Sequence, residues 1–517
     1  MSTTAAISRR LIRAAGFAAV AVFLALVARF WHPVFRFTSL LQLDASNDDC
    51  KIAAFRKIPV FVYRDTGGYD GLYYAQIAYH PALDAAELGP AIDSLTYRAR
   101  RILVPALAWL LSAGNPKWIV HVYSLLNVAA WLVLAALFWR LLAVNNGRGW
   151  IAWAGLLFSA GALSSVRYAL TDLTALALVT GAILAAERGR NRWAIGALGA
   201  AGLARETSLL ALTSLATRPW LSWRNAGRAL LVLAPLAGWL GYMRWRIGPL
   251  DPGAGNFDWP VVSFVQKWRA DLPAAASLEV HWLAWTTLLA TLGLTVQAAF
   301  FFTRWRPEDR WWRMGMVYSA LMFCLGGAVW DGSPGAATRV LLPLNLAFNV
   351  LVHRTRAPLL WLLAGNLSVF SGLQVMDPVS NEALSLATQS NGTSYVGRFG
   401  DGWFGREHSW RHTWTWSSGR STVIFEASPK NSRKLWLEFS TRSLVPRTVL
   451  IHQDSREICR ALVGTERTPQ SVPVQLVDGR AILEFSTDIP GVPENSNRGA
   501  RALAFSVYDP QLIESKP

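Results

Sequence analysis

Residues 64–101 read RDTGGYDGLYYAQIAYHPALDAAELGPAIDSLTYRARR. This stretch is acidic, aromatic and glycine-rich at its start and basic at its end, and it lies between apolar segments. Glycine lets a backbone turn tightly beside a ligand, and tyrosine offers a flat face with a polar tip, which suits a sugar or a membrane interface. The rest of the chain is therefore expected to hold this loop at the edge of a membrane.

The composition indicates a polytopic membrane protein with a polar tail. Of the 517 residues, 52% are hydrophobic and only 16% are charged, against about 25% charged in soluble proteins. The formal net charge of +17 comes largely from basic residues in short loops between apolar segments, as the positive-inside rule requires. No basic and aromatic array typical of RNA or DNA binding is visible, so no nucleic-acid partner is expected.

The basic loops predict a polytopic α-helical domain at residues 1–373, with about eleven crossings, the N-terminus in the cytoplasm and the C-terminus outside. Residues 32–117 form the first outer loop, and SSVRY (164–168) is expected as a tight outer turn. Residues 102–114 are apolar but shorter than the ~20 residues that span a bilayer, which favours an interfacial or re-entrant helix. The crossings are expected near residues 14–31, 118–144, 150–164, 169–187, 193–217 (twice), 229–246, 280–303, 314–330, 340–352 and 357–373.

One segment, residues 193–217, carries the charged pair Arg205 and Glu206 in its middle. Both of its ends adjoin basic loops, so it crosses twice or not at all, and two short helices are expected to meet at the pair. Charges at membrane depth are costly unless they are paired or hydrated, so they mark a cavity by default. Arg205 is the first choice for binding a phosphate, and an internal ion pair with Glu206 is the alternative.

The chain changes character near residue 374. Residues 374–390 have the composition of a linker, and residues 391–517 show short alternating runs separated by turn residues, which predict an extracytoplasmic β-sandwich of the jelly-roll kind. The tryptophans of this tail form either a carbohydrate-binding surface or a small aromatic core. They are Trp403, Trp410, Trp414 and Trp416.

A disulfide between Cys50 and Cys459, both expected outside, is left open.

Two aspartates, Asp65 and Asp70, stand at the head of the opening stretch. A carboxylate beside low-dielectric lipid can act as a general base towards a hydroxyl group. The alternative is a loop in the aromatic belt of the membrane whose aspartates cap turns.

A family resemblance favours the catalytic interpretation. The first outer loop resembles that of the GT-C superfamily of membrane glycosyltransferases, and looks most like the branch of PIG-V-type and other mannosyltransferases. The resemblance covers roughly residues 10–373. It rests on the pattern Tyr69-Asp70-Gly71-x-Tyr73-Tyr74-x-x-Ile77-Ala78, followed by Tyr97-Arg98-x-Arg100-Arg101-Ile102-Leu103-x-Pro105.

The resemblance implies an inverting enzyme that uses a polyprenyl-phosphate-linked sugar at the outer face of a bacterial inner membrane. The acceptor would be a glycan, lipid or protein of the cell envelope. The family's catalytic aspartate matches Asp70 best, with Asp65 second. A fuller two-acidic metal motif is not evident, so a divalent cation, Mg²⁺ or Mn²⁺, is left open.

Further side chains are candidates for binding the substrate. The alternative for Arg100 and Arg101 is that they extend towards lipid headgroups. The alternative for Asp331 is a role in the turn WDGSPG, and the alternative for His80 is that of an interfacial histidine. Asp172 either lines the pocket or caps a helix. The substrate-binding candidates are Tyr69, Tyr73, Tyr74, His80, Arg100, Arg101, Arg205, Glu206, Asp331 and Arg339.

Two other function classes compete with the glycosyltransferase. A transporter or flippase of lipid-linked sugars would show broken helices in matching halves, and only the segment around Arg205 has that character. A non-catalytic envelope scaffold would leave residues 65–101 without a purpose. No Walker, dinucleotide or zinc-like spacing is present, so a nucleotide-sugar donor is not expected.

Overall fold

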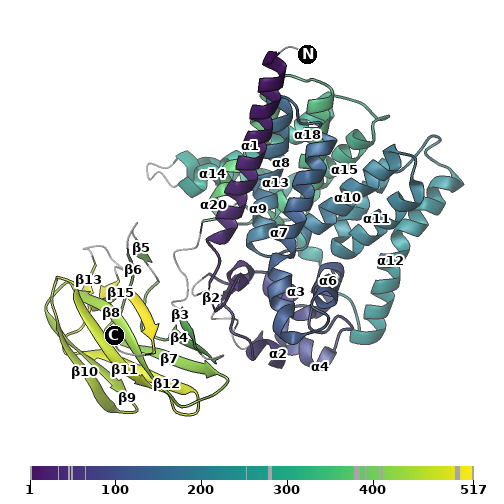
Figure 1. Cartoon of the computed structure of the whole chain (residues 1–517). Helices are drawn as coiled ribbons and strands as arrows, with labels where there is room; N and C mark the ends of the chain where they lie inside the picture. The colour runs from purple at the N-terminus through teal and green to yellow at the C-terminus, as the bar shows by residue number, and fades with distance from the viewer. Residues whose placement is uncertain are drawn as a thin grey trace. The chain divides into compact units, whose positions relative to one another are not determined.

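The computed structural model describes two compact units (Figure 1). One comprises residues 1–29 and 70–377 and is helical, and the other comprises residues 30–69 and 378–517 and is mostly β-structure. Asp65 and Trp410 lie outside the described residues. The residues that the structure describes are 3–32, 34–44, 47, 50–63, 66–251, 253–276, 282–332, 334–377, 385–390, 393–405, 407–408, 412–494 and 501–514.

The helical unit consists of long apolar helices joined by short ones. Its helices are α1 (Thr3–Ala28), α3 (Gly71–Ile77), α4 (Ala85–Leu88), the 3-10 helix η3 (Gly89–Ala91), α5 (Leu95–Arg98), α6 (Leu103–Leu111), α7 (Pro116–Leu141), α8 (Gly147–Leu157), α9 (Ala160–Arg167), α10 (Asp172–Glu187), α11 (Asn191–Ala204), the 3-10 helix η4 (Glu206–Ser214), α12 (Trp223–Ile247), the 3-10 helix η5 (Ala254–Asn256), α13 (Val262–Ala276), α14 (Trp282–Thr303), α15 (Arg310–Cys324), α16 (Gly327–Trp330), α17 (Ala337–Val340), α18 (Leu342–Arg354), α19 (Leu359–Gly365) and α20 (Val369–Val375).

Helix starts follow the local sequence. The side chain of Asn115 accepts a hydrogen bond from the backbone N–H of Lys117, at 3.1 Å, at the start of α7. Asp309 does the same for Trp311, at 2.7 Å, at the start of α15. Such caps satisfy N–H groups that have no partner within the helix.

Four helices of the described chain are long and apolar enough to cross a membrane, or five if the bent pair α8–α9 forms one span. The four are α1 (from Arg10), α7, α12 and α14. The expected eleven crossings are therefore not confirmed. Shorter helices occupy several of the expected spans, and α8 and α9 bend by 42° at the break between them.

The segment around Arg205 folds as its sequence predicts. Helix α11 ends at Ala204, η4 begins at Glu206, and Arg205 between them has an extended backbone with φ −156° and ψ 120°. A Cβ on Gly202 would lie 2.8 Å from the Leu209 side chain, so this glycine allows the two helices to pack closely. The short apolar helix α6 (Leu103–Leu111) is also present as expected.

Two loops differ from the expected pattern. SSVRY is not a turn: residues up to Arg167 belong to α9, and the turn lies at Ala169, whose φ is +46°. The expected loop at 247–279 contains the helix α13. Buried Asp271 of α13 pairs with Lys267 at 3.2 Å and accepts a hydrogen bond from Thr291 of α14 at 2.7 Å, which holds the two helices together.

The second unit begins with the segment just before Asp70. It holds η1 (Thr38–Leu41), β1 (Leu43–Asp44), α2 (Ala53–Arg56) and β2 (Val62–Tyr63), and β1 and β2 pair in parallel. The buried Asp44 carboxylate accepts hydrogen bonds from the backbone N–H and the hydroxyl of Thr66, both at 2.8 Å. Phe35, Phe61 and Tyr63 share a small core with Val396 of the tail, so the segment and the tail form one unit.

The tail contains two sheets that bury one common hydrophobic cluster. The six-stranded sheet has the order β10-β9-β12-β7-β4-β3, and the five-stranded sheet has the order β11-β8-β15-β6-β5. Strand β3 lies within residues 374–390, where the sequence indicated a linker. The strands are β3 (Ser385–Ser390), β4 (Thr393–Phe399), β5 (Glu407–His408), β6 (Thr413–Trp416), β7 (Arg420–Ser428), β8 (Lys434–Ser443), β9 (Arg447–Gln453), β10 (Arg456–Val463), β11 (Thr468–Gln475), β12 (Arg480–Thr487), β13 (Val492–Pro493), β14 (Ala502–Leu503) and β15 (Phe505–Ile513).

The tail tryptophans have different environments. Trp403 is buried in the common cluster, where its ring meets Phe399, Phe485 and Phe505 edge-on. Trp416 is buried as well, whereas Trp414 is half-buried and stacks on Tyr508. Among the described members of this group, the prediction of a carbohydrate-binding surface therefore depends on Trp414. Cys50 and Cys459 are not joined by a disulfide.

Replacing Trp403 by alanine should unfold the tail at lower temperature. The change removes a buried indole and its hydrogen bond to the Thr422 carbonyl oxygen, and core Trp→Ala changes cost about 3–5 kcal/mol. Limited proteolysis of the full chain in membranes, over a temperature series, measures the loss. The control is Leu462→Ala, at a side chain that is 76% exposed, and equal protection of both variants would contradict the core assignment.

Candidate active site

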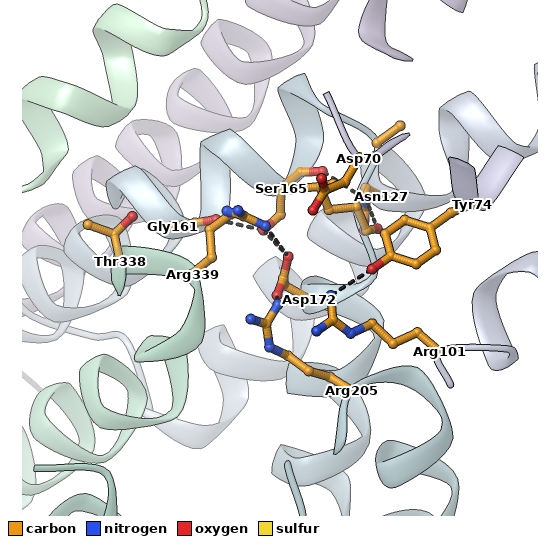
Figure 2. A network of polar contacts seen from close by, with 12 residues as sticks. Asp70, Tyr74, Arg101, Asn127, Gly161, Ser165, Asp172, Arg205, Thr338 and Arg339 are labelled. Atoms are coloured by element: carbon orange, nitrogen blue, oxygen red, sulfur yellow. Dashed lines mark hydrogen bonds and ion pairs between the residues drawn. The ribbon is translucent and has the colours of Figure 1, made fainter. Parts of the chain in front are cut away.

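The polar centre of the helical unit is built from three carboxylates, each paired with arginine. They are Asp70 just before α3, Asp172 at the start of α10 and Glu206 at the start of η4. Figure 2 shows Asp172 together with Arg205 and Arg339, with Tyr74, Arg101 and Asp70 beside them. The site thus joins the segment from Asp70 to Arg101 to helices far apart in the sequence.

Asp172 is the most deeply buried of the three carboxylates. Its side chain is 1% exposed and forms ion pairs with Arg205 and, at 3.5 Å, with Arg339. The hydroxyl of Ser165 donates a further hydrogen bond to it at 3.3 Å. A buried charge is tolerated only when it is paired and hydrogen-bonded, so the two arginines are what allows a carboxylate here. The helix-capping interpretation of Asp172 is wrong, because Thr171 occupies the cap position.

Helix α7 holds Asp172 in place through the turn that precedes it. The Asn127 side-chain amide donates hydrogen bonds to the backbone oxygens of Ser165, at 2.8 Å, and of Leu170. The Tyr123 hydroxyl donates to the backbone oxygen of Ala169 at 2.9 Å. The sequence interpretation did not include Asn127 and Ser165, and the available signal was a polar side chain inside an apolar span.

Arg339 reaches Asp172 because α9 and α17 approach closely. A Cβ added to Gly161 would collide with the backbone of Thr338, and both residues are seen side by side in Figure 2. Glycine is required at such a contact because it has no side chain. Gly161 is therefore a structural part of the site.

Arg101 links the loop to the break between α11 and η4. It forms two hydrogen bonds with the carboxylate of Glu206, both at 3.0 Å, and others with the hydroxyls of Tyr74 at 2.6 Å and Tyr97 at 3.2 Å. Burial raises the pKa of the Tyr74 hydroxyl against the opposing effect of Arg101, so this group stays protonated. Glu206 therefore pairs with Arg101 and not with Arg205, its neighbour in the sequence.

Asp70 lies at the more exposed end of the network. Its side chain is 27% exposed and pairs with Arg98 at 2.9 Å. Arg98 also forms two hydrogen bonds with Asp93, at 2.8 and 3.1 Å, and lies over the ring of Tyr73. Arg98 thus keeps partners of its own if its contact with Asp70 is broken.

The charges of the site are unevenly distributed. Arg205 and Arg339 both form ion pairs with the carboxylate of Asp172, so two buried cations meet at this end of the network. Arg98 pairs with the carboxylates of Asp70 and Asp93, which are the more exposed acidic groups of the site. The like charges of Arg101 and Arg339 both act on Arg205. The network therefore has an acidic, partly exposed end and a basic, buried end.

Other predicted residues are not part of this network. Within the described chain, His80 has no side-chain contact to it, and Asp331 is exposed and ends α16. Arg100 lies over the ring of Tyr97 at 5.5 Å, at the margin of the site. Tyr69 belongs to the second unit. The snorkelling interpretation of Arg101 is wrong, because its side chain is buried and paired.

The described carboxylates of the site do not fit a divalent cation. No group of three acidic, histidine or cysteine side chains among the described residues is placed to hold a metal. The carboxylates of Asp70, Asp172 and Glu206 each already face an arginine, whereas Mg²⁺ and Mn²⁺ need carboxylate oxygens that are free to bind them. These three carboxylates therefore offer no place for either ion.

Comparisons with known proteins give a distant structural similarity. No family model matches the chain, and no curated protein does. Among solved structures, the chain is similar to the arabinosyltransferase EmbB from Mycobacterium smegmatis, with 11% sequence identity and a TM-score of 0.25. The match covers 96% of this chain and 64% of that protein, so the chain spans less than two thirds of its length. A similarity this low carries no argument about fold or function.

Glu206→Gln should destabilise the helical unit, because it leaves the buried Arg101 without its carboxylate. Breaking a buried ion pair by removing one partner costs about 3–5 kcal/mol. The temperature at which the detergent-solubilised protein loses its monodisperse chromatographic peak measures the effect. The double variant Arg101→Met with Glu206→Leu removes both charges and should recover much of the loss. If the double variant is as unstable as the sum of its two single variants, the pair assignment is wrong.

Proposed function

We propose that the chain is a membrane glycosyltransferase of the GT-C kind. It would transfer a sugar from a polyprenyl-phosphate donor to an acceptor of the cell envelope, at the outer face of a bacterial inner membrane. The observation that carries the proposal is the network with a partly exposed carboxylate, Asp70, at one end and two buried arginines, Arg205 and Arg339, at the other.

This chemistry needs the two ends of the network to act differently. A sugar bound to a lipid phosphate already has a good leaving group, so its departure requires cations and no general acid. The acceptor hydroxyl is a weak nucleophile and requires a base. Asp70 supplies the carboxylate, and Arg205 and Arg339 supply the cations.

Burial strengthens the basic end. Arg205 is 8% and Arg339 is 6% exposed, and electrostatic attraction is stronger in such an environment than in water. A phosphate that enters beside these arginines meets two guanidinium groups without the screening of bulk solvent. Arginine also suits phosphate by geometry, because its guanidinium donates two parallel hydrogen bonds.

The proposed step is a single displacement at the anomeric carbon. The acceptor O–H gives its proton to the Asp70 carboxylate, and its oxygen forms a bond to the anomeric carbon. The bond from that carbon to the phosphate oxygen breaks, and its electrons stay with the phosphate beside Arg205 and Arg339. Attack from the face opposite the leaving group inverts the configuration. Arg98 pairs with both Asp70 and Asp93. When Asp70 takes the proton and becomes neutral, Arg98 therefore keeps its ion pair with Asp93.

Asp70→Asn should abolish sugar transfer, with a fall in kcat of about 10²–10⁴, the usual contribution of a general base. The measurement is turnover of the purified protein on a panel of polyprenyl-phosphate sugars, read as release of polyprenyl phosphate. A transporter would release none. The matched control is Asp93→Asn, which also removes a carboxylate from Arg98 and should cost less than about tenfold. Turnover by the Asp70→Asn variant at the wild-type rate would refute the role of Asp70.

The proposed orientation places residues 70–115 outside and the basic loop at 188–192 in the cytoplasm. Glu87 and Arg192 are both exposed, so cysteines at these positions report the two sides. In a chain whose three native cysteines are changed to serine, a membrane-impermeant maleimide should label Glu87→Cys in intact spheroplasts but not Arg192→Cys. Both should react after permeabilisation. Labelling of Arg192→Cys in intact spheroplasts would overturn the orientation.

A further inference from the structure

A groove outside the candidate active site lies between the helices α1, α7 and α8. Its volume is about 520 Å³, within the roughly 300–1,000 Å³ of small-molecule sites. Phe17, Val20, Leu132 and Trp153 supply much of its apolar lining. Two arginines, Arg13 and Arg140, are its charged members.

The two arginines lie at the same level of the helix pair. A Cβ on Gly16 of α1 would lie 2.5 Å from the ring of Trp139 of α7, and further along, Phe23 of α1 stacks on Trp131 of α7 at 3.6 Å. Residue numbers therefore rise along α1 as they fall along α7, so the helices are antiparallel. Arg13, near the start of the apolar span Arg10–Ala28 of α1, and Arg140, near the end of α7, consequently mark the same end of the groove.

The surroundings of the groove are those of a membrane surface. Both α1 and α7 are long and apolar enough to cross a membrane. Phe17 is 78% exposed, and lipid tails suit such a side chain better than water does. An arginine at the end of a span is stabilised by the headgroup region.

The charge of the groove is not balanced within the described chain. Arg13 and Arg140 are exposed, and no carboxylate of the described residues forms an ion pair with either. Basic pockets between membrane-spanning helices bind anionic lipid headgroups. A soluble phosphate would leave the apolar walls unfilled, and a lipid with no net charge would leave both arginines uncompensated.

We propose that this groove is a specific site for an anionic phospholipid. One acyl chain lies along the apolar walls formed by α1, α7 and α8, and the phosphate lies between Arg13 and Arg140. Gly16 is required because a side chain there would displace Trp139 and close the groove. The site is independent of the proposed transfer reaction.

The test is native mass spectrometry of the full chain in detergent, titrated with dioleoyl phosphatidylglycerol or dioleoyl phosphatidylcholine. The wild type should retain phosphatidylglycerol in preference to phosphatidylcholine. The double variant Arg13→Gln with Arg140→Gln should lose about thirtyfold in affinity for phosphatidylglycerol, since each arginine near a membrane surface contributes about a factor of five. Its affinity for phosphatidylcholine should not change.

Two further variants separate the site from general charge and from misfolding. Arg192→Gln removes a cation from an exposed position far along the chain and should bind phosphatidylglycerol as the wild type does. Ala136→Phe fills the groove from an exposed position and should weaken binding while both arginines remain. The proposal is overturned if the double variant binds phosphatidylglycerol as tightly as the wild type does. It is also overturned if Arg192→Gln loses as much affinity as the double variant, or if glycerol 3-phosphate alone displaces the lipid.

Discussion

The buried carboxylate of Asp172, held between Arg205 and Arg339, is the interaction on which the centre of the helical unit depends. A charge that is 1% exposed is stable only if its lost hydration is replaced. Three groups replace it: the guanidinium of Arg205 at the break after α11, the guanidinium of Arg339 on the short helix α17, and the hydroxyl of Ser165. These elements are fixed in position because each must deliver a polar group to the same carboxylate.

The constraint extends outward from Asp172 towards the surface. Arg205 is followed by Glu206, which receives Arg101, and Arg101 in turn holds the hydroxyl of Tyr74 on α3. Helix α3 starts directly after Asp70. The segment from Asp70 to Arg101 is therefore attached to the long helices by charged groups and not by apolar packing alone. An arrangement of this kind places a carboxylate precisely with respect to buried cations, which is what transfer from a lipid phosphate requires.

Sequence reasoning located the break at Arg205, because parity between two basic loops required a return in the middle of the segment. The alternative that it left open, an ion pair between Arg205 and Glu206, is not formed: Arg205 pairs with Asp172 and Glu206 with Arg101. The backbone of Arg205 is extended, and in extended chain successive side chains point to opposite sides. Arg205 consequently faces Asp172, and Glu206 faces Arg101. Asp172 itself, within ALTDLTALAL, had the pattern of a helix start, and only the tertiary approach of α17 at Gly161 shows why it pairs with Arg339.

The arginines of the helical unit divide into two classes that differ in how their charge is satisfied. Arg98, Arg101, Arg205 and Arg339 have carboxylate partners within the unit. Arg13 and Arg140 stand at the ends of apolar helices and have no such partner among the described residues. The interior arginines need their partners within the chain because the hydrocarbon around them offers none. At the helix ends a membrane would supply phosphate groups, and the proposed lipid site uses the same side chain where no carboxylate of the described residues pairs with it.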